Sequence, residues 1–533
     1  MSSFYDLASL VMIPSGKKAG KVYSQKPLTT DGQLDFTRAS TATRIGPTGL
    51  IEKTRTNELT YSNDFSNAVW NKSQSGGATP VLTSGFTDPN GGSNAWRLEC
   101  SITSGSYSMM TRSLSTTGLN CNSIYIKSNT GSDQDVYFRL DNGDQTTTRT
   151  ATASWQRIQV FSNAVGQSYT IGVRDNATGS TSSCDVLIYA AQTEQGLVAT
   201  SYIETTTAAV SVGSVDNMPR LNYTPGSATS CPSLLLEPQR TNLIAQSEYF
   251  DTWTLIGGGT VTTNTSVSPD GNVNAATIEP LNYARNIFTM SGGSNTFSIY
   301  FKGKDANCVV RIGFLGPGDS GLIFTDETIT TSEWKRINVT YTNATAPLGV
   351  FFSIQSGDND VYAYGAQVEA GSYATSYIPT FGATVTRVSD TTCNITNFLS
   401  KGIISTALTW TVFFDLEGLS TNNNIGDSQF IAGADSTLDV YVRPENENSL
   451  FARFYWRKDG KYIGSNFGKK IIARLSGGTG TTFVDGALNN SSSISGDYSL
   501  LGITRNSNSV GKINKILIFP TALTDAQCIE LTT

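Results

Sequence analysis

The sequence Ser-Ile-Tyr-Ile-Lys at residues 123–127 alternates apolar and polar side chains, and it returns as Ser-Ile-Tyr-Phe-Lys at residues 298–302. A period of two is typical of a β-strand with one buried face and one wet face. The alternation continues in residues 136–140 and 156–160, and turns rich in Gly, Asn, Asp and Ser separate the segments. The pattern therefore predicts antiparallel β-structure made of short strands.

This strand belongs to a duplicated unit. Both copies open on Glu-x-x-Arg-Thr-Asn, at residues 52–57 and 237–242, and both close on Ala-Gln followed by Thr-Ser-Tyr-Ile, within 191–203 and 366–378. The motifs between these blocks keep the same order in the two copies, which indicates an internal duplication. We expect two jelly-roll sandwiches, residues 51–208 and 233–388, joined by a linker at 209–232.

The opening motif of each copy predicts local contacts. We expect Glu52 to pair with Arg55 and Glu237 with Arg240, and we expect Asn57 and Asn242 to fix a turn through hydrogen bonds from side chain to backbone.

The two ends of the chain differ from the repeat. Residues 389–533 contain apolar strands and finish on a capping box, Thr-Asp-Ala-Gln at 524–527, which predicts a third, unrelated sandwich and a short helix. Residues 1–50 have few core signals and several Gly, Pro and Lys breaks, so we expect an extended N-terminal arm. The predicted fold class is all-β, with tandem antiparallel β-sandwiches after that arm.

Composition excludes several kinds of chemistry. The chain has 533 residues and no histidine, which removes Ser-His-Asp and Cys-His catalysis and histidine-ligated metals. Its net charge of −6 argues against a basic surface for nucleic acid or anionic membranes.

The cysteines and the N-terminus indicate where the protein is made. The seven cysteines are widely spaced and lack a Cys-x-x-Cys motif, so we expect free buried thiols in a chain folded in a reducing cytosol. The apolar run 10–13 is too short for a signal peptide or a membrane span.

Paired carboxylates are the chemistry that remains, because a glycosidase needs two carboxyl groups about 5 to 10 Å apart. Asp415 and Glu417 form the nearest pair in the third domain, and Glu445 and Glu447 follow in a predicted loop. We interpret both pairs as solvated and assign no catalytic residue. Asp88 and Asp270 lie in oxygen-rich turns that suit Ca²⁺, but turn chemistry explains them as well, so we assign no metal and no cofactor.

Tryptophan and tyrosine side chains are the candidates for ligand contact. Trp70 with Trp253, and Trp155 with Trp334, are matched between the copies, and we expect them to pack. Trp96 is replaced by Ala276 in the second copy, so the repeat does not need it for folding. Trp96, with Tyr455 and Trp456 of the third domain, is therefore a candidate ligand-binding residue.

Two resemblances follow from these motifs. The order of a strand ending in Phe-Val-Asp-Gly (483–486), a strand ending in Phe-Pro (519–520) and Ala-Leu-Thr-Asp-Ala-Gln (522–527) resembles concanavalin A/laminin-G-like lectin domains. The duplicated unit resembles jelly-roll carbohydrate-binding modules of the CBM4/9 kind, through its entrance tryptophan and its closing Gln-x-Glu-x-Gly. These resemblances imply carbohydrate binding.

The linker blocks resemble those of bacteriophage virion fibre and spike proteins, including crAss-like phages of Bacteroidales. They are Leu-Asp-Phe-Thr-Arg-Ala-Ser-Thr-Ala-Thr-Arg at 34–44 and Met-Pro-Arg-Leu-Asn-Tyr at 218–223. The resemblance implies a head or tail fibre subunit that is made in the host cytoplasm and exposed on the extracellular virion. It further implies a homotrimer that attaches to other virion proteins, here through the arm.

We therefore expect a non-enzymatic virion protein that attaches to host-surface or mucus glycans, with no nucleic-acid partner and no membrane insertion. Two alternatives stay open. One is a purely structural capsid or tail decoration protein, and the other is a capsule depolymerase with glycosidase activity.

Overall fold

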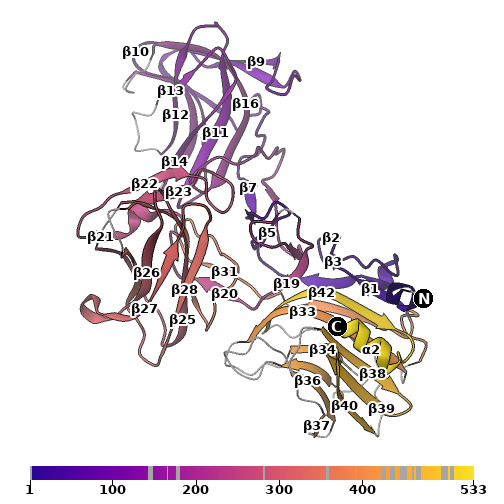
Figure 1. Ribbon diagram of the computed structural model, residues 1–533. Helices are drawn as coiled ribbons and strands as arrows, with labels where there is room; N and C mark the ends of the chain where they lie inside the picture. The colour runs from indigo at the N-terminus through magenta and orange to yellow at the C-terminus, as the bar shows by residue number, and fades with distance from the viewer. Residues whose placement is uncertain are drawn as a thin grey trace.

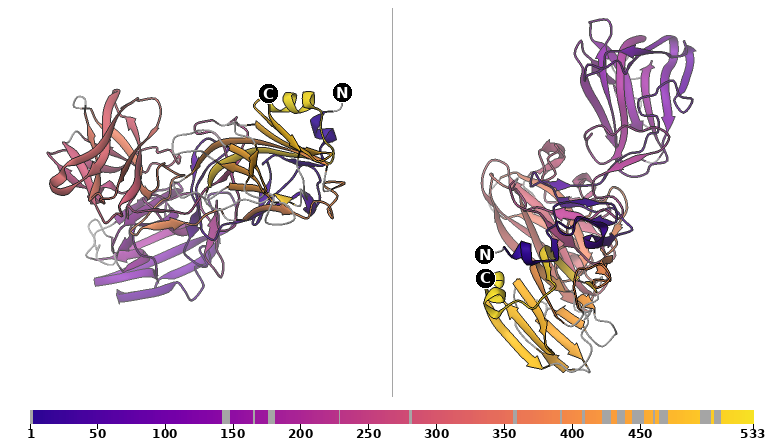
Figure 2. Two further views of the ribbon diagram at one scale, coloured as in Figure 1. Left: turned by 90° about the horizontal axis from the view of Figure 1, so that it is seen from below. Right: turned by 90° about the vertical axis from the view of Figure 1, so that its right-hand side faces the viewer.

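The computed structural model consists of two β-sandwiches and a C-terminal β-domain (Figures 1 and 2). It describes residues 3–141, 148–164, 166–175, 181–227, 229–279, 282–355, 359–390, 392–406, 409–421, 428–432, 439–443, 453–458, 461–463, 470–493, 502–503 and 509–533. The named sheets are antiparallel throughout their paired strands, which confirms the predicted all-β class.

The first sandwich is two five-stranded sheets that share one long strand, β10. One sheet has the order β9-β10-β16-β11-β14 and the other β13-β12-β15-β10-β8. The register of β10 shifts between Ile102 and Tyr107, where it passes from one sheet to the other. The strands are β8 (Asn71–Gly77), β9 (Val81–Phe86), β10 (Ala95–Ser113), β11 (Asn120–Ser128), β12 (Gln134–Asp141), β13 (Thr148–Ala151), β14 (Gln156–Ser162), β15 (Gln167–Arg174) and β16 (Ser183–Gln195).

The second sandwich repeats this plan with the long strand divided in two. Its sheets are β22-β23-β30-β25-β28 and β21-β24-β29-β26-β27. The strands are β21 (Thr254–Ile256), β22 (Val261–Ser266), β23 (Ala275–Ile278), β24 (Tyr283–Ile287), β25 (Gly293–Gly303), β26 (Cys308–Leu315), β27 (Gly321–Ile329), β28 (Lys335–Asn343), β29 (Gly349–Ile354) and β30 (Val361–Ala370). The turns η2 (Phe250–Thr252) and η3 (Pro317–Asp319) are 3-10 helices.

The repeated opening and closing motifs hold each sandwich together by the same hydrogen bonds. The Asn57 amide donates to the carbonyls of Ala191 and Ile203, and Asn242 donates to those of Ala366 and Ile378. This side-chain-to-backbone role of the two asparagines was predicted. Because buried polar groups need hydrogen-bond partners, the opening motif with its asparagine and the closing motif with its carbonyls occur together in both copies.

Two predicted ion pairs are wrong. The spacing suggested that Glu52 pairs with Arg55 and Glu237 with Arg240, but Glu52 pairs with Arg44. Glu237 instead pairs with Arg220 and Arg387. The reason is strand pairing: the β5–β6 and β18–β19 hairpins bring Arg44 and Arg220 to the two glutamates, and the pairing of β31 with β20 brings Arg387.

Three small strand pairs connect the larger units. They are β5 (Arg44–Ile45) with β6 (Ile51–Glu52), β7 (Arg55–Asn57) with β17 (Val210–Val212), and β20 (Arg240–Asn242) with β31 (Val385–Arg387).

The prediction that residues 1–50 form an extended arm is wrong, because most of this segment belongs to the C-terminal domain. Strand β1 pairs with β42, and β4 pairs with β32. The apolar side chains Leu10, Leu34 and Phe36 are buried in the core that also holds Trp410. Both chain ends therefore lie in this domain (Figure 1).

The C-terminal domain is built from three parts of the sequence. One sheet has the order β18-β19-β42-β33-β38-β39-β40, with β1 beside β42, and the other β2-β3-β4-β32-β41-β34-β35-β36-β37. Strands from residues 1–37 are β1 (Leu10–Met12), β2 (Lys17–Lys18), β3 (Lys21–Val22) and β4 (Leu34–Thr37). The linker contributes β18 (Arg220–Asn222), and β19 (Ser233–Leu236) comes from the start of the segment predicted to be the second jelly roll, which therefore begins later than predicted. The remaining strands are β32 (Thr392–Thr396), β33 (Trp410–Thr421), β34 (Ser428–Ala432), β35 (Asp439–Arg443), β36 (Arg453–Lys458), β37 (Lys461–Ile463), β38 (Lys470–Ser476), β39 (Thr479–Val484), β40 (Ala487–Ser493), β41 (Gly502–Ile503) and β42 (Ser509–Phe519).

Short helices close this domain. Helix α1 (Phe4–Leu7), the 3-10 turn η1 (Thr30–Gly32) and helix α2 (Asp525–Thr532) are described. Helix α2 begins on the predicted capping box, in which the Thr524 side chain and Gln527 cap each other. Neither α-helix in the described part of the chain has the length and apolar character needed to cross a membrane.

Candidate functional site

The outer face of the sheet β21-β24-β29-β26-β27 carries a row of aromatic rings, which we call the aromatic row: Tyr283, Phe351 and Phe324. Phe351 and Phe324 lie opposite Gly313, one on each side, in neighbouring strands. A Cβ at Gly313 would lie 2.6 Å from the Phe351 ring, so only a glycine leaves room for it here. The Tyr283 and Phe351 ring centroids are 6.3 Å apart.

The alternation of the strands explains why these rings face outward. Val310, Ile312 and Phe314 of β26 point into the core of the sandwich. Arg311 and Gly313 between them must therefore face the other way. Phe324, on the edge strand β27, is 50% exposed, which is unusual for a phenylalanine on a sheet.

Charged side chains frame the aromatic row. The Arg311 guanidinium lies 3.9 Å from the centre of the Phe324 ring and makes a bidentate ion pair with Asp326, with N–O distances of 2.6 and 2.7 Å. Arg285 pairs with Asp319, which also accepts a hydrogen bond of 2.9 Å from the Tyr283 hydroxyl. Flat rings beside fixed donors and acceptors are the groups that bind a sugar through its C–H face and its hydroxyls.

These carboxylates are poorly suited to acid catalysis. Hydrogen bonds from Arg285 and Tyr283 lower the pKa of Asp319, and the hydrogen bond from Arg311 lowers the pKa of Asp326. A general acid in a glycosidase needs a raised pKa. The face therefore has the composition of a binding surface, without a proton donor among these two carboxyl groups.

The equivalent face of the first sandwich is closed. Tyr137 is 1% exposed there, because the guanidiniums of Arg139 and Arg174 lie 5.6 and 5.8 Å from its ring centre and Met109 packs beside it. The two sandwiches therefore share a fold but differ on this face: in the second one Phe324 is exposed and Tyr283 half-buried, while Phe351 beside them is 8% exposed.

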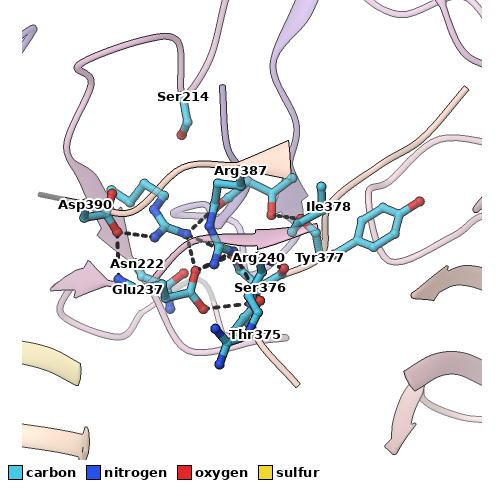
Figure 3. A network of polar contacts seen from close by, with 12 residues as sticks. Ser214, Asn222, Glu237, Arg240, Thr375, Ser376, Tyr377, Ile378, Arg387 and Asp390 are labelled. Carbon is cyan, nitrogen blue, oxygen red and sulfur yellow. Dashed lines mark hydrogen bonds and ion pairs between the residues drawn. The ribbon is translucent and has the colours of Figure 1, made fainter. Parts of the chain in front are cut away.

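A second polar cluster, the junction network, lies where the N-terminal segment, the linker and the second sandwich meet the C-terminal domain. Figure 3 shows Glu237 and Asp390 with Arg387 and Ser376 around them. Asp390 accepts from Arg38, at 3.1 Å, and from Arg220, and all three side chains are fully buried.

The arginines of the junction network keep the Glu237 carboxyl group ionised. Burial raises the pKa of Glu237, but Arg387 and Arg220 outweigh burial and lower it. Glu237 also accepts from the Ser376 backbone at 2.7 Å. All four carboxylate oxygens of Glu237 and Asp390 thus have partners, and we assign the network a structural role.

The structure places the predicted ligand residue Trp96 in a packing position. Its ring packs against the core of the first sandwich, 6.2 Å from the Phe65 centroid, and its N–H donates to the Asn63 carbonyl at 2.9 Å. The other two candidates, Tyr455 and Trp456, have side chains outside the described residues. Trp70 and Trp253 are buried, as their matched positions predicted.

The predicted carboxylate and calcium positions are engaged in local contacts. Asp415 accepts from the Asn514 amide at 3.0 Å, and Glu417 pairs with Lys512 at 2.8 Å. Asp88 caps its own turn, accepting from Asn90, Gly92 and Asn94, and Asp270 pairs with Lys53. Glu445 and Glu447 lie outside the described residues.

In the described ranges, no group of three or more His, Cys, Asp or Glu side chains is placed to hold a metal ion. Of the six cysteines whose side chains are described, five are buried and Cys231 is exposed, in contrast to the predicted burial of the thiols. Burial raises the pKa of the Cys528 thiol to about 11 and that of Cys308 above its usual value, which suppresses thiolate reactivity.

The sequence interpretation did not single out the aromatic row. Its signal was the run Gly-Leu-Ile-Phe at 321–324, an apolar segment without the polar alternation of a surface strand. This run has no counterpart among the motifs shared by the two copies, so the repeat did not draw attention to it.

Comparison with known proteins gave structural similarity alone. No protein-family model matches the chain, and no curated protein sequence matches it. The CBM22-1–CBM22-2 tandem domain of Paenibacillus barcinonensis Xyn10C is similar over 59% of this chain and 96% of its own, with 13% identity and a TM-score of 0.22.

Two further solved structures are similar over shorter stretches. A CBM4 structure covers 24% of this chain and 92% of its own, with 18% identity and a TM-score of 0.19. The enzymatically active domain of bacteriophage CBA120 tailspike protein 4 covers 24% of this chain and 21% of its own, with 14% identity and a TM-score of 0.20. The fold described above is assigned from the strand pairing of this chain.

Proposed function

We propose that the protein is a non-enzymatic subunit of a bacteriophage virion, a head or tail fibre or spike, that attaches the particle to host-surface or mucus glycans. The observation that carries glycan binding is the aromatic row, in which the exposed Phe324 ring lies under Arg311 and opposite Gly313, and Phe351 packs over that glycine. An exposed ring such as Phe324, framed by fixed polar groups, is unfavourable in water, and a sugar that covers it removes that apolar surface from solvent.

The virion role is supported by the linker blocks at 34–44 and 218–223, which resemble those of phage fibre and spike proteins. We extend the proposal to exposure on the extracellular particle after synthesis in the host cytoplasm, and to a homotrimer as in other fibres of this class. Since residues 1–37 complete the C-terminal domain, attachment to other virion proteins would use a folded surface of the protein.

The test is binding of the full chain to an array of bacterial capsular and mucin glycans, followed by calorimetry on the glycans that bind. We expect Phe324→Ala combined with Tyr283→Ala to weaken binding at least tenfold. Tyr5→Ala, which removes an exposed aromatic ring from helix α1, is the matched control and should bind as the wild type does.

If the protein binds no glycan on the array, or if the double variant binds as well as the wild type, the aromatic row is not a glycan site. The same incubations, assayed for newly released reducing ends, separate binding from depolymerisation. Release of oligosaccharide by the wild type would refute the non-enzymatic proposal.

A further inference from the structure

The hairpin β5–β6 covers a cluster of tyrosines on the second sandwich. This cluster, Tyr300, Tyr364 and Tyr377, packs against Ile45 and Ile51 of the hairpin. The Ile51 backbone N–H donates to the Pro269 carbonyl at 2.9 Å, so the contact includes a backbone hydrogen bond as well as apolar burial. Tyr364 and Tyr377 are 0% and 2% exposed beneath it.

A lysine that follows the hairpin completes this contact. Lys53 pairs with Glu248 at 2.8 Å and with Asp270 at 2.7 Å, and both carboxylates are almost fully buried. The hydroxyl of Tyr364 donates to both carboxylates at 3.1 Å. Glu248 and Asp270, the acidic pair, therefore favour a hairpin that is followed by a positively charged residue such as Lys53.

The first sandwich repeats the same tyrosine cluster, as Tyr125, Tyr189 and Tyr202. The ring centroids of Tyr125 and Tyr189 are 6.2 Å apart, as are those of Tyr300 and Tyr364. Arg157 lies 5.3 Å from the Tyr125 ring, and Arg336 lies 5.4 Å from the Tyr300 ring.

The hydrogen bond that orients the third tyrosine is also repeated. The Tyr202 hydroxyl is 2.6 Å from the Ser62 hydroxyl, and the Tyr377 hydroxyl is 2.6 Å from that of Ser247. The architecture that receives a hairpin in the second sandwich is therefore present in the first.

Two differences separate the clusters. The tyrosines of the first cluster are all half-buried, whereas two of the three in the second are fully covered. Furthermore, Asn63 stands at the position of Glu248 and Asn90 at that of Asp270, so amides replace the acidic pair. A lysine enclosed here would lack both carboxylates that pair with Lys53 in the second sandwich, and Asp88 of the same turn already accepts hydrogen bonds from Asn90, Gly92 and Asn94.

We propose that the tyrosine cluster of the first sandwich is a docking surface for a β-hairpin of a neighbouring protein subunit, with aliphatic side chains at the positions of Ile45 and Ile51 and an uncharged polar residue at that of Lys53. The chain itself supplies the precedent, because its own hairpin occupies the equivalent surface one sandwich further along. The Asn63 amide already accepts from the Ala190 N–H and donates to the Asn94 carbonyl, and its second N–H, with the Asn90 amide, provides neutral hydrogen-bonding groups for the third position. This inference is independent of the glycan proposal.

The probe is a cyclic peptide of residues 43–54, closed by D-Pro-Gly to keep the β5–β6 pairing, in its native form and with Lys53→Gln. Binding of the fluorescent peptides to the full chain is followed by anisotropy. We expect the Lys53→Gln peptide to bind the wild-type chain at least tenfold more tightly than the native peptide. The order should reverse on the variant Asn63→Glu/Asn90→Asp, which restores the acidic pair.

Tyr189→Ala and Tyr125→Ala, each checked for an unchanged melting temperature, locate the site, and either should weaken binding at least tenfold. Absence of saturable binding by both peptides, or equal binding to the wild type and both tyrosine variants, would overturn the proposal. Binding of neutral oligosaccharides such as cellohexaose, lost in Tyr189→Ala while the peptides fail to bind, would overturn it in favour of a glycan surface.

Discussion

Replacing Asp390 by Asn should loosen the C-terminal domain where the junction network holds it. Asp390 is fully buried and shares its charge between two guanidiniums, those of Arg38 and Arg220, while it also accepts from the Glu237 backbone at 2.8 Å. The amide keeps the shape of the side chain but removes its charge. Three buried arginines, Arg38, Arg220 and Arg387, are then left with Glu237 as the one carboxylate among these partners. Breaking a buried pair from one side costs about 3–5 kcal/mol.

Hydrogen exchange measured by mass spectrometry is the suitable assay, because a multidomain chain need not unfold in one step and local opening can be read peptide by peptide. A loss of about 3–5 kcal/mol lowers protection by roughly two to three and a half powers of ten, at about 1.4 kcal/mol for each tenfold. We expect this loss in the peptides that cover β4 and β18, and little change in β11 and β12 of the first sandwich.

Asp326→Asn is the matched control, because it removes a carboxylate from an arginine pair that is 29% and 41% exposed. A surface pair contributes about 0–1 kcal/mol, so protection near β27 should change by less than about tenfold. If Asp390→Asn changes protection no more than Asp326→Asn does, then the junction network does not stabilise the domain and the reasoning fails.

Three further predictions concern stability. Asn242→Ala should cost about 2–4 kcal/mol in the second sandwich, since the side chain makes four buried hydrogen bonds of roughly 1 kcal/mol each; Thr241→Ala, on the exposed side of β20, is the control in the same urea unfolding series. Burial raises the pKa of Asp270, but Lys53 outweighs it and lowers the pKa to about 2, so the pair adds stability that is complete above pH 4 and is lost as the pH falls toward 2. The stability difference between wild type and Asp270→Asn should therefore shrink over that interval, and a constant difference would contradict the ion pair. Residues 389–533 expressed alone should give circular dichroism and proteolysis typical of an unfolded chain, because they lack β1–β4, β18 and β19; a folded fragment would contradict the three-part domain.

The sequence contained enough information to predict the class of the fold, because the alternation of residues such as Ile124 and Tyr125 reflects local strand geometry and the duplication multiplied that signal. It did not place the N-terminal segment, although Leu34-Asp35-Phe36-Thr37 alternates in the same way. A single short strand does not reveal its partner, and β4 pairs with β32, which lies hundreds of residues later.

The candidate site was harder to predict for a related reason. Trp96 was singled out because it differs between the copies. Whether a ring can contact a ligand depends instead on which face of the sheet it lies on and which side chains surround it. Phe324 is exposed because β27 is an edge strand opposite Gly313, and Phe351 lies beside that glycine on the next strand. Those relations come from strand register, which depends on pairing across the whole sheet.

The pairing of β1 with β42 has a consequence for synthesis on the ribosome. The Ser9 hydroxyl donates to the carbonyl of Ile518, 509 positions later. At translation rates of about 5 to 20 residues per second, the first strands wait roughly 25 to 100 s for the partner that covers them. Both sandwiches emerge and can fold during that interval, so the C-terminal domain is completed after the two sandwiches that lie between its parts in the sequence. In the nascent chain β1 lacks β42 and β4 lacks β32 until those partner strands have been made, and a chaperone that shields β1 to β4 would act at the step when the chain is most prone to aggregate.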